Sequence, residues 1–93
     1  KAEKRMRNLA HMEVKGRIAE ALLEIADTFG NNQNGYINIT MTRQDIASYA
    51  GTTYETVFKF FNDLTNSSII STSGKSIKID KPEELRSYIK ESA

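Results

Sequence analysis

Cysteine is absent from this chain of 93 residues, which excludes disulfide bonds and thiolate metal sites. A single histidine, His11, argues against a histidine-based metal site and against a Ser-His-Asp triad. No apolar run approaches the roughly 18 residues that a membrane span needs, and no signal peptide is visible. We therefore expect no membrane partner and a cytoplasmic location.

The length suits one small domain, and 39% hydrophobic residues are enough for a core. Because the chain begins with Lys rather than Met, we expect it to be a piece of a longer protein.

Charge is nearly balanced, with a formal net charge of +1, so overall charge does not indicate a nucleic-acid binder. Between positions 18 and 63 only Arg43 and Lys59 are basic. The other basic residues include two groups: Lys1, Lys4, Arg5, Arg7, Lys15 and Arg17 near the N-terminus, and Lys75, Lys78 and Lys81 near a predicted turn. On charge alone, solvated faces are the better interpretation, and a DNA-binding domain would have to gather these cations by folding.

The first half of the chain predicts a long helical region. One apolar stripe at helical spacing runs through Val14, Ile18, Leu22, Ile25 and Phe29. Residues 1–12 predict a separate or a continuing helix, and Gly16 at the join indicates a hinge. After Gly30 and a polar loop, the alternation of residues 36–39 predicts a short strand.

Two helix-start signals follow in quick succession. Thr42 and Asp45 have the spacing of a capping box, and Thr52 and Glu55 repeat it. The predicted buried sides of the two helices are Ile46, Ala47 and Ala50, then Val57, Phe60, Phe61 and Leu64. Gly51 breaks the first helix, so a tight turn at residues 50–52 joins the two as a helix-turn-helix.

The remaining residues predict a hairpin and a last helix. Residues 69–72 and 76–80 are the expected strands, with Ser73-Gly74 as the turn signal. Pro82 begins a helix to about Glu91, with Leu85 and Ile89 pointing inward. The expected fold is mainly α with a small β component: a winged helix-turn-helix with an N-terminal helix, a short strand, the helix-turn-helix, a β-hairpin wing and a C-terminal helix.

In a helix-turn-helix, the second helix enters the major groove of DNA, here residues 53–64. A Glu carboxylate accepts from cytosine N4, Lys donates to guanine or to phosphate, and Thr hydroxyls bind phosphate. The first helix begins where it would cross the backbone, and a wing tip would reach a phosphate. The predicted DNA-contacting residues are Arg43, Gln44, Thr53, Tyr54, Glu55, Thr56, Phe58, Lys59, Gly74 and Lys75.

Most of these residues also have a purely structural interpretation. Glu55 could complete a capping box with Thr52, which its spacing slightly favours, and Lys59 could simply pair with Glu55. Thr53 could be the cap itself. Phe58 departs from the core spacing, and it could touch a thymine methyl group or fill a neighbouring gap. Gly74 could serve only the turn, and Lys75 only solubility.

Several segments together closely resemble the C-terminal domain of the cAMP receptor protein and fumarate–nitrate regulator (Crp/Fnr) family. The resemblance runs from about Leu9 to Ile79, with the segments in the right order and spacing. The segments are Val14-Lys15-Gly16-Arg17-Ile18-Ala19, Thr42-Arg43-Gln44-Asp45-Ile46-Ala47, Gly51-Thr52-Thr53-Tyr54-Glu55-Thr56-Val57, and Ile69-Ile70 followed by Gly74-Lys75-Ser76-Ile77.

The resemblance implies a division of the chain and a set of partners. Residues 1–13 would be the end of a dimerisation helix with its hinge, and residues 14–93 the winged-helix DNA-binding domain. An N-terminal sensor domain would precede them and hold the effector, for which a cyclic nucleotide is one candidate, so no cofactor is expected here. The full-length protein would be a homodimer that binds near-palindromic DNA and acts on RNA polymerase.

The family's recognition helix typically reads bases with Arg-Glu and a second Arg four residues after the Glu. Tyr54, Glu55 and Lys59 stand at those positions here. Glu55 matches, Tyr54 cannot form the bidentate contact of Arg to guanine, and Lys59 lacks the planar fork. We therefore expect a half-site that differs from the family's best-known one at the guanine that the missing Arg would read.

A winged-helix module for protein–protein association is the competing function, supported by the low net charge and by Tyr54 and Phe58 on an exposed face. An enzyme is a distant third. The sequence has no metal-ligand cluster, no phosphate-binding glycine-rich loop and no Cys nucleophile, so no catalytic or metal residue is assigned.

Overall fold

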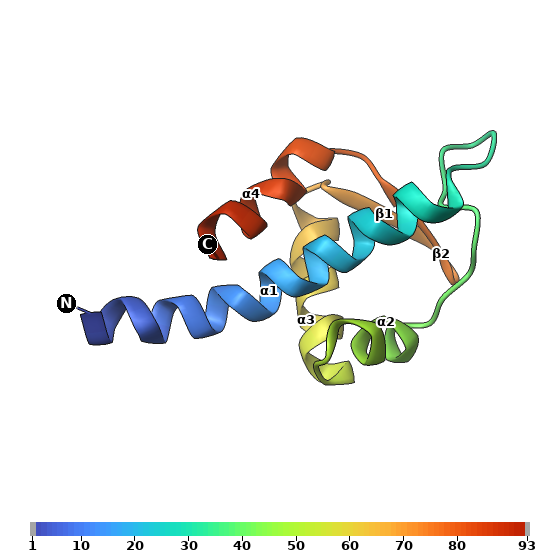
Figure 1. Ribbon diagram of the computed structural model, residues 1–93. Coiled ribbons are helices and arrows are strands. Elements are labelled where there is room, and N and C mark those ends of the chain that lie inside the picture. The colour runs from blue at the N-terminus through green and yellow to red at the C-terminus, as the bar shows by residue number, and fades with distance from the viewer. Residues whose placement is uncertain (1, 93) are drawn as a thin grey trace.

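The computed structural model describes residues 2–92, with side chains described for residues 14–89. The elements are α1 (Ala2–Phe29), α2 (Arg43–Ala50), α3 (Tyr54–Asn66), β1 (Ile70–Ser73), β2 (Ser76–Ile79) and α4 (Pro82–Ser92). Figure 1 shows α1 crossing the whole molecule, with α2 below it, α4 above it and α3 passing behind it. Helix-turn-helix, hairpin and last helix follow in the predicted order, so the predicted winged helix-turn-helix is confirmed.

Helix α1 is continuous through Gly16, so residues before and after it form one helix rather than two. Its first half extends away from the body of the molecule (Figure 1). Ile18, Leu22 and Ile25 are buried, as their stripe predicts. Phe29, the last residue of the stripe, is 45% exposed. Phe29 is the last residue of α1, and the polar loop that follows protrudes from the body (Figure 1).

The core lies where α1, α2, α3 and α4 meet. The predicted buried sides of α2 and α3 are confirmed, and Phe60 and Phe61 are almost fully enclosed. Helix α4 packs along α1 and inserts Leu85, which is 0% exposed. The ring of Tyr88 meets Phe60 edge-on, with centroids 5.0 Å apart. Helix α4 is therefore an integral part of the domain.

The turn between α2 and α3 is built by local signals and tied down from a distance. The capping box of Thr42 and Asp45 is present at the start of α2, as predicted. Gly51 ends the helix in the left-handed conformation, with φ 74° and ψ 40°, and its N–H donates to the Ala47 carbonyl. The guanidinium of Arg17 on α1 donates to the carbonyls of Ala50 (3.1 Å) and Gly51 (3.3 Å), which fixes the turn against α1.

Residues 36–39 do not form the predicted strand. Ile37 makes an isolated bridge with Asn31, and its N–H donates to the Ile77 carbonyl at 2.7 Å. The Asn32 side chain accepts from the backbone N–H groups of Asn34 and Tyr36, which holds the segment in a turn. Because these turn bonds use groups that a longer ladder would need, pairing stops after one position. Ile37 is buried all the same, so the alternation identified the inward side chain correctly.

Strands β1 and β2 form an antiparallel hairpin in which Ser73 pairs with Ser76. The loop is therefore Gly74-Lys75, one residue later than the Ser73-Gly74 signal. Gly74 has φ 62°, and glycine at the first loop position is typical of the type II′ hairpin turn. Both strand boundaries agree with the prediction to within one residue.

Candidate nucleic-acid interface

Thr53 is the N-cap of helix α3, and its hydroxyl accepts from the N–H of Thr56 at 3.3 Å. The hydroxyls of Thr53 and Thr56 are also hydrogen-bonded to each other, at 2.9 Å. The predicted capping box between Thr52 and Glu55 is therefore wrong. With Thr53 as the cap, Glu55 is the second residue of the helix, whereas a capping box needs its acid at the third. The structural interpretation of Thr53 is confirmed.

Four of the predicted residues, Tyr54, Glu55, Phe58 and Lys59, lie exposed on one side of α3. In the part of the chain that the structure describes, no ion pair joins Glu55 to Lys59. The side chain of Glu55 makes no hydrogen bond with any described residue, so its carboxylate is available to a ligand. The helix thus presents an acceptor, a cation and two aromatic rings to solvent near its N-terminus.

The two aromatic residues of this face contact each other. The rings of Tyr54 and Phe58 are stacked, with centroids 6.0 Å apart and planes at 23°. Tyr54 is 46% and Phe58 44% exposed, although Phe60 and Phe61 of the same helix are buried. Phe58 therefore lies outside the core, against Tyr54.

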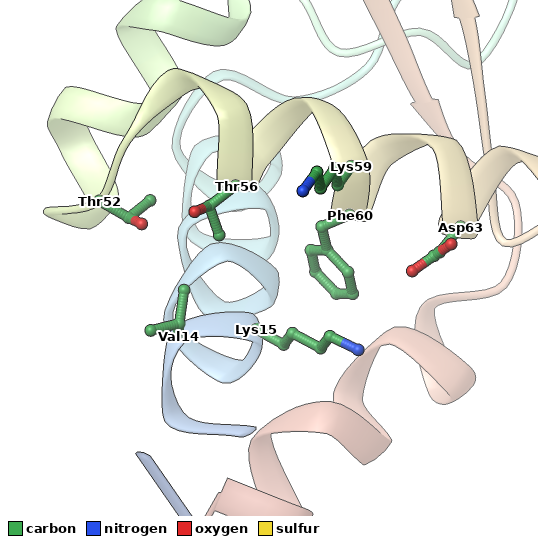
Figure 2. Close-up of a pocket in the computed structure, with 7 residues that line it drawn as sticks. All are labelled: Val14, Lys15, Thr52, Thr56, Lys59, Phe60 and Asp63. Carbon is green, nitrogen blue, oxygen red and sulfur yellow. The ribbon is translucent and has the colours of Figure 1, made fainter. Parts of the chain in front are cut away.

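Lys59 also lines an open cavity of about 470 Å³ between α1 and the first half of α3. Figure 2 shows its lining residues, which are Val14, Lys15, Thr52, Thr56, Lys59, Phe60 and Asp63. Lys15 extends from α1 beneath the Phe60 ring, with its Nζ atom 5.9 Å from the ring centroid (Figure 2). Folding therefore brings a cation of the N-terminal group to the same cavity as the cation of α3.

The remaining predicted residues have different environments. Gln44 is exposed at the start of α2, and Gly74 and Lys75 are exposed at the tip of the hairpin. Arg43 is half-buried with its guanidinium 5.2 Å from the Phe61 ring centroid, and its Nε atom is buried without a hydrogen-bond partner among the described residues. Arg43 therefore packs against the core and is less available than its position predicts.

Two contacts that hold α2 and its turn against α1 were not predicted from the sequence. One is the bond from Arg17 to the turn, which joins residues 33 positions apart and has no local signal. The other links α2 to α1, where the Tyr49 hydroxyl donates to Glu24 at 3.1 Å. The Glu24 carboxylate raises the pKa of the Tyr49 phenol above its ordinary value of 10.0, through this hydrogen bond and through its charge. Neither pair has a spacing that a single helix would favour.

No group of three or more His, Cys, Asp or Glu side chains that could hold a metal ion occurs among the described residues. Nor does any helix in the described part of the chain have the length and apolar character needed to cross a membrane.

The fold and this exposed helix define the class of protein: a winged helix-turn-helix domain with an open second helix. Residues 16–88 match the family model described as the Crp-like helix-turn-helix domain, so the chain belongs to that family. The Crp/Fnr resemblance is thereby confirmed, and the predicted short strand within it is replaced by the single bridge at Ile37.

Curated relatives agree with this family. The chain is 35% identical over 80 residues to the "CRP-like cAMP-activated global transcriptional regulator" of Mycobacterium tuberculosis, covering 84% of the chain and 36% of that protein. It is 39% identical over 72 residues to the "Nitrogen fixation regulation protein FixK" of Rhizobium meliloti, covering 76% and 33%. The chain thus spans about a third of the length of these relatives. Both relatives are named as regulators and not as enzymes.

The solved structure of FixK2 from Bradyrhizobium japonicum is similar in fold, with a TM-score of 0.69 and 29% identity. The match covers 81% of this chain and 37% of that one.

Proposed function

We propose that this chain binds double-stranded DNA with sequence specificity, as the output domain of an effector-controlled regulator. Helix α3 lies in the major groove and the hairpin tip at Gly74-Lys75 lies on the backbone. The observation that carries the proposal is the open side of α3. Its charged groups, Glu55 and Lys59, make no ion pair with each other, and they belong to the second helix of a Crp-like helix-turn-helix.

On this proposal, Glu55 accepts from the N4 amino group of a cytosine in the major groove. Lys59 shares the α1–α3 cavity with Lys15 and with the carboxylate of Asp63. The remaining excess of one positive charge beside this opening favours a DNA phosphate over a base edge. Tyr54 takes the position of a guanine-reading Arg without its paired donors. The half-site therefore differs from the family's best-known one at that guanine.

The remaining contacts position the domain on the duplex. Lys75 at the hairpin tip and Gln44 at the start of α2 are exposed, and both bind backbone phosphates. The hydroxyls of Thr53 and Thr56 are engaged in the cap, but each oxygen retains capacity for a phosphate or a water. Arg43 adds to the positive potential from its place on Phe61.

The rest of the proposal concerns the whole protein. Residues 1–13 are the end of a dimerisation helix with its hinge. A sensor domain outside this chain binds the effector, with a cyclic nucleotide as the first candidate. The homodimer acts in the cytoplasm on RNA polymerase at near-palindromic operators. The support is the family match together with the length of α1, whose first half extends from the body as a dimerisation helix would.

Selection against a random double-stranded DNA library tests the proposal. The chain is carried as a dimer on a coiled coil fused to its N-terminus, and binding of the winners is repeated at several salt concentrations. We expect an inverted repeat with half-site centres about 10 base pairs apart or a multiple of that spacing, and affinity that falls steeply with salt. An unenriched library with weak, salt-insensitive binding would refute DNA as the ligand.

A protein-association module is the second candidate, because Tyr49, Tyr54 and Phe58 are all large and exposed. Tyr49 lies on α2 and the stacked pair lies on α3, so a protein partner would have to cover both helices. This candidate predicts a protein complex whose affinity changes little with salt and falls on Tyr49→Ala. It gains support only if the DNA selection fails.

A further inference from the structure

The stacked pair of Tyr54 and Phe58 is the least expected feature of the exposed side of α3. Each ring leaves nearly half of its surface in water, on a helix that buries two other Phe residues. The residues are one helical turn apart, and their stacking restricts both side chains. The helix therefore carries a preformed apolar ridge beside Glu55.

The chemistry of the major groove limits what such a ridge can recognise. Phe58 has no hydrogen-bonding group, and Tyr54 has a single hydroxyl. The base edges in that groove present hydrogen-bond donors or acceptors. Thymine alone adds an apolar group, its C5-methyl. We propose that the Tyr54–Phe58 ridge reads thymine methyl groups, and so specifies thymine at one or more positions of each half-site. This inference rests on the proposed function and deepens it.

The surroundings of the ridge favour DNA over a protein partner. A carboxylate and an ammonium group flank the rings on the same helix, at Glu55 and Lys59. Two side chains make a patch much smaller than the ~800 Å² per partner that a stable protein interface buries. The ridge is small, apolar and flanked by charged groups. A thymine edge, with one methyl group beside hydrogen-bonding groups, complements it better than an apolar protein surface does.

Replacing thymine by deoxyuridine tests the inference, because it removes the methyl group and keeps the Watson–Crick pairing. The dimerised chain is first selected on the thymine library, and the winning duplex is then synthesised with deoxyuridine at one thymine at a time. Fluorescence anisotropy measures the affinity of each duplex. We expect a loss of about fourfold at each contacted thymine, which corresponds to burying one methyl-sized group.

Two variants assign the effect to the ridge. Phe58→Ala should bind thymine and deoxyuridine duplexes equally, and Tyr54→Ala should reduce the difference. Phe29→Ala is the matched control, because Phe29 is also an exposed Phe, at 45%, but lies at the end of α1. The control should keep the full thymine preference. Circular dichroism confirms that each variant is folded.

The outcomes separate this inference from the proposed function. Enrichment of a duplex whose affinity is unchanged by deoxyuridine at every position would overturn the thymine reading and leave DNA binding standing. The same holds if Phe58→Ala retains the wild-type preference. If no duplex is enriched and binding ignores salt, the proposed function fails, and the inference fails with it.

Discussion

Thr53 and Glu55 lie two residues apart at the start of α3, and the structure assigns them different tasks. Thr53 holds the first turn of the helix through the N–H and the hydroxyl of Thr56. The side chain of Glu55 is exposed and makes no hydrogen bond with the described residues. Stability and sequence preference should therefore respond to different substitutions.

We expect Thr53→Ala to lower the free energy of unfolding by about 1 kcal/mol, because the helix loses its N-cap acceptor. Glu55→Ala should cost at most about 0.5 kcal/mol, from the interaction of an exposed carboxylate with the helix dipole. Urea denaturation measures both values. Selection on random DNA should show an altered half-site for Glu55→Ala. If Glu55→Ala kept the half-site unchanged and lost much stability, Glu55 would have a structural role and would not read a base.

The hydrogen bond between Tyr49 and Glu24 should make stability depend on pH. Because the pKa of Tyr49 is raised in the folded chain, the folded state holds the phenol proton more tightly than the unfolded state does. The stabilisation is complete below pH 10.0 and is lost as the pH rises from there through the higher folded pKa.

Ultraviolet absorbance of tyrosinate, compared between the wild type and Tyr49→Phe, isolates the titration of this one of the four Tyr residues. Glu24→Gln should return the pKa of Tyr49 toward its ordinary value, since both main causes of the shift are removed. The same substitution should weaken the loss of stability above pH 10.0. If Glu24→Gln left the pKa of Tyr49 unchanged, the hydrogen bond to Glu24 would not be the cause of its raised pKa.

The role of helix α4 follows from its packing against α1 and α3. Sequence reasoning assigned it no function beyond packing, and the structure places Leu85 fully inside the common core. Its Tyr88 ring also contacts Phe60, whose helix carries the candidate interface. Helix α4 therefore supports α3 from behind without contributing to its exposed side.

Leu85→Ala should reduce the free energy of unfolding by about 2–5 kcal/mol, through lost burial and the cavity left behind. Arg86→Ala is the matched control on the neighbouring position, because Arg86 is exposed and pairs with the exposed Glu83 at 3.3 Å. Thermal or urea denaturation distinguishes the two. Equal stability of both variants would show that α4 is dispensable for the fold.

The whole molecule combines a net charge of only +1 with a local gathering of cations. Lys15 and Lys59 are 44 positions apart in the chain, yet they line one cavity between α1 and α3. Lys75 is displayed separately at the tip of the hairpin. Affinity for DNA should therefore depend on a few placed cations and not on overall charge.

Lys75→Ala should weaken binding about equally on all DNA sequences and reduce the slope of log K against log salt by about one unit. The measurement is binding of specific and unrelated duplexes at several salt concentrations. Lys81→Ala, an exposed Lys after the hairpin, serves as a control and should leave the slope unchanged. An unaltered slope in Lys75→Ala would contradict a contact between the hairpin tip and phosphate.

Much of this architecture is predictable from local sequence. Helical spacing identified the buried sides of α2 and α3, and the capping box at Thr42 and the turn at Gly51 were recognised from neighbouring residues alone. These features depend on interactions within one or two turns of chain, so spacing is sufficient to predict them.

Where the local sequence allowed two structures, only the tertiary structure decided between them. Thr53 and not Thr52 caps α3, and the turn bonds of Asn32 stop residues 36–39 from pairing as a strand. Likewise, Phe58 is left in water while Phe60 and Phe61 are enclosed. Spacing shows which residues share a side of a helix, but only the packing of α1, α2 and α4 around α3 decides which side is covered and which remains open to a ligand.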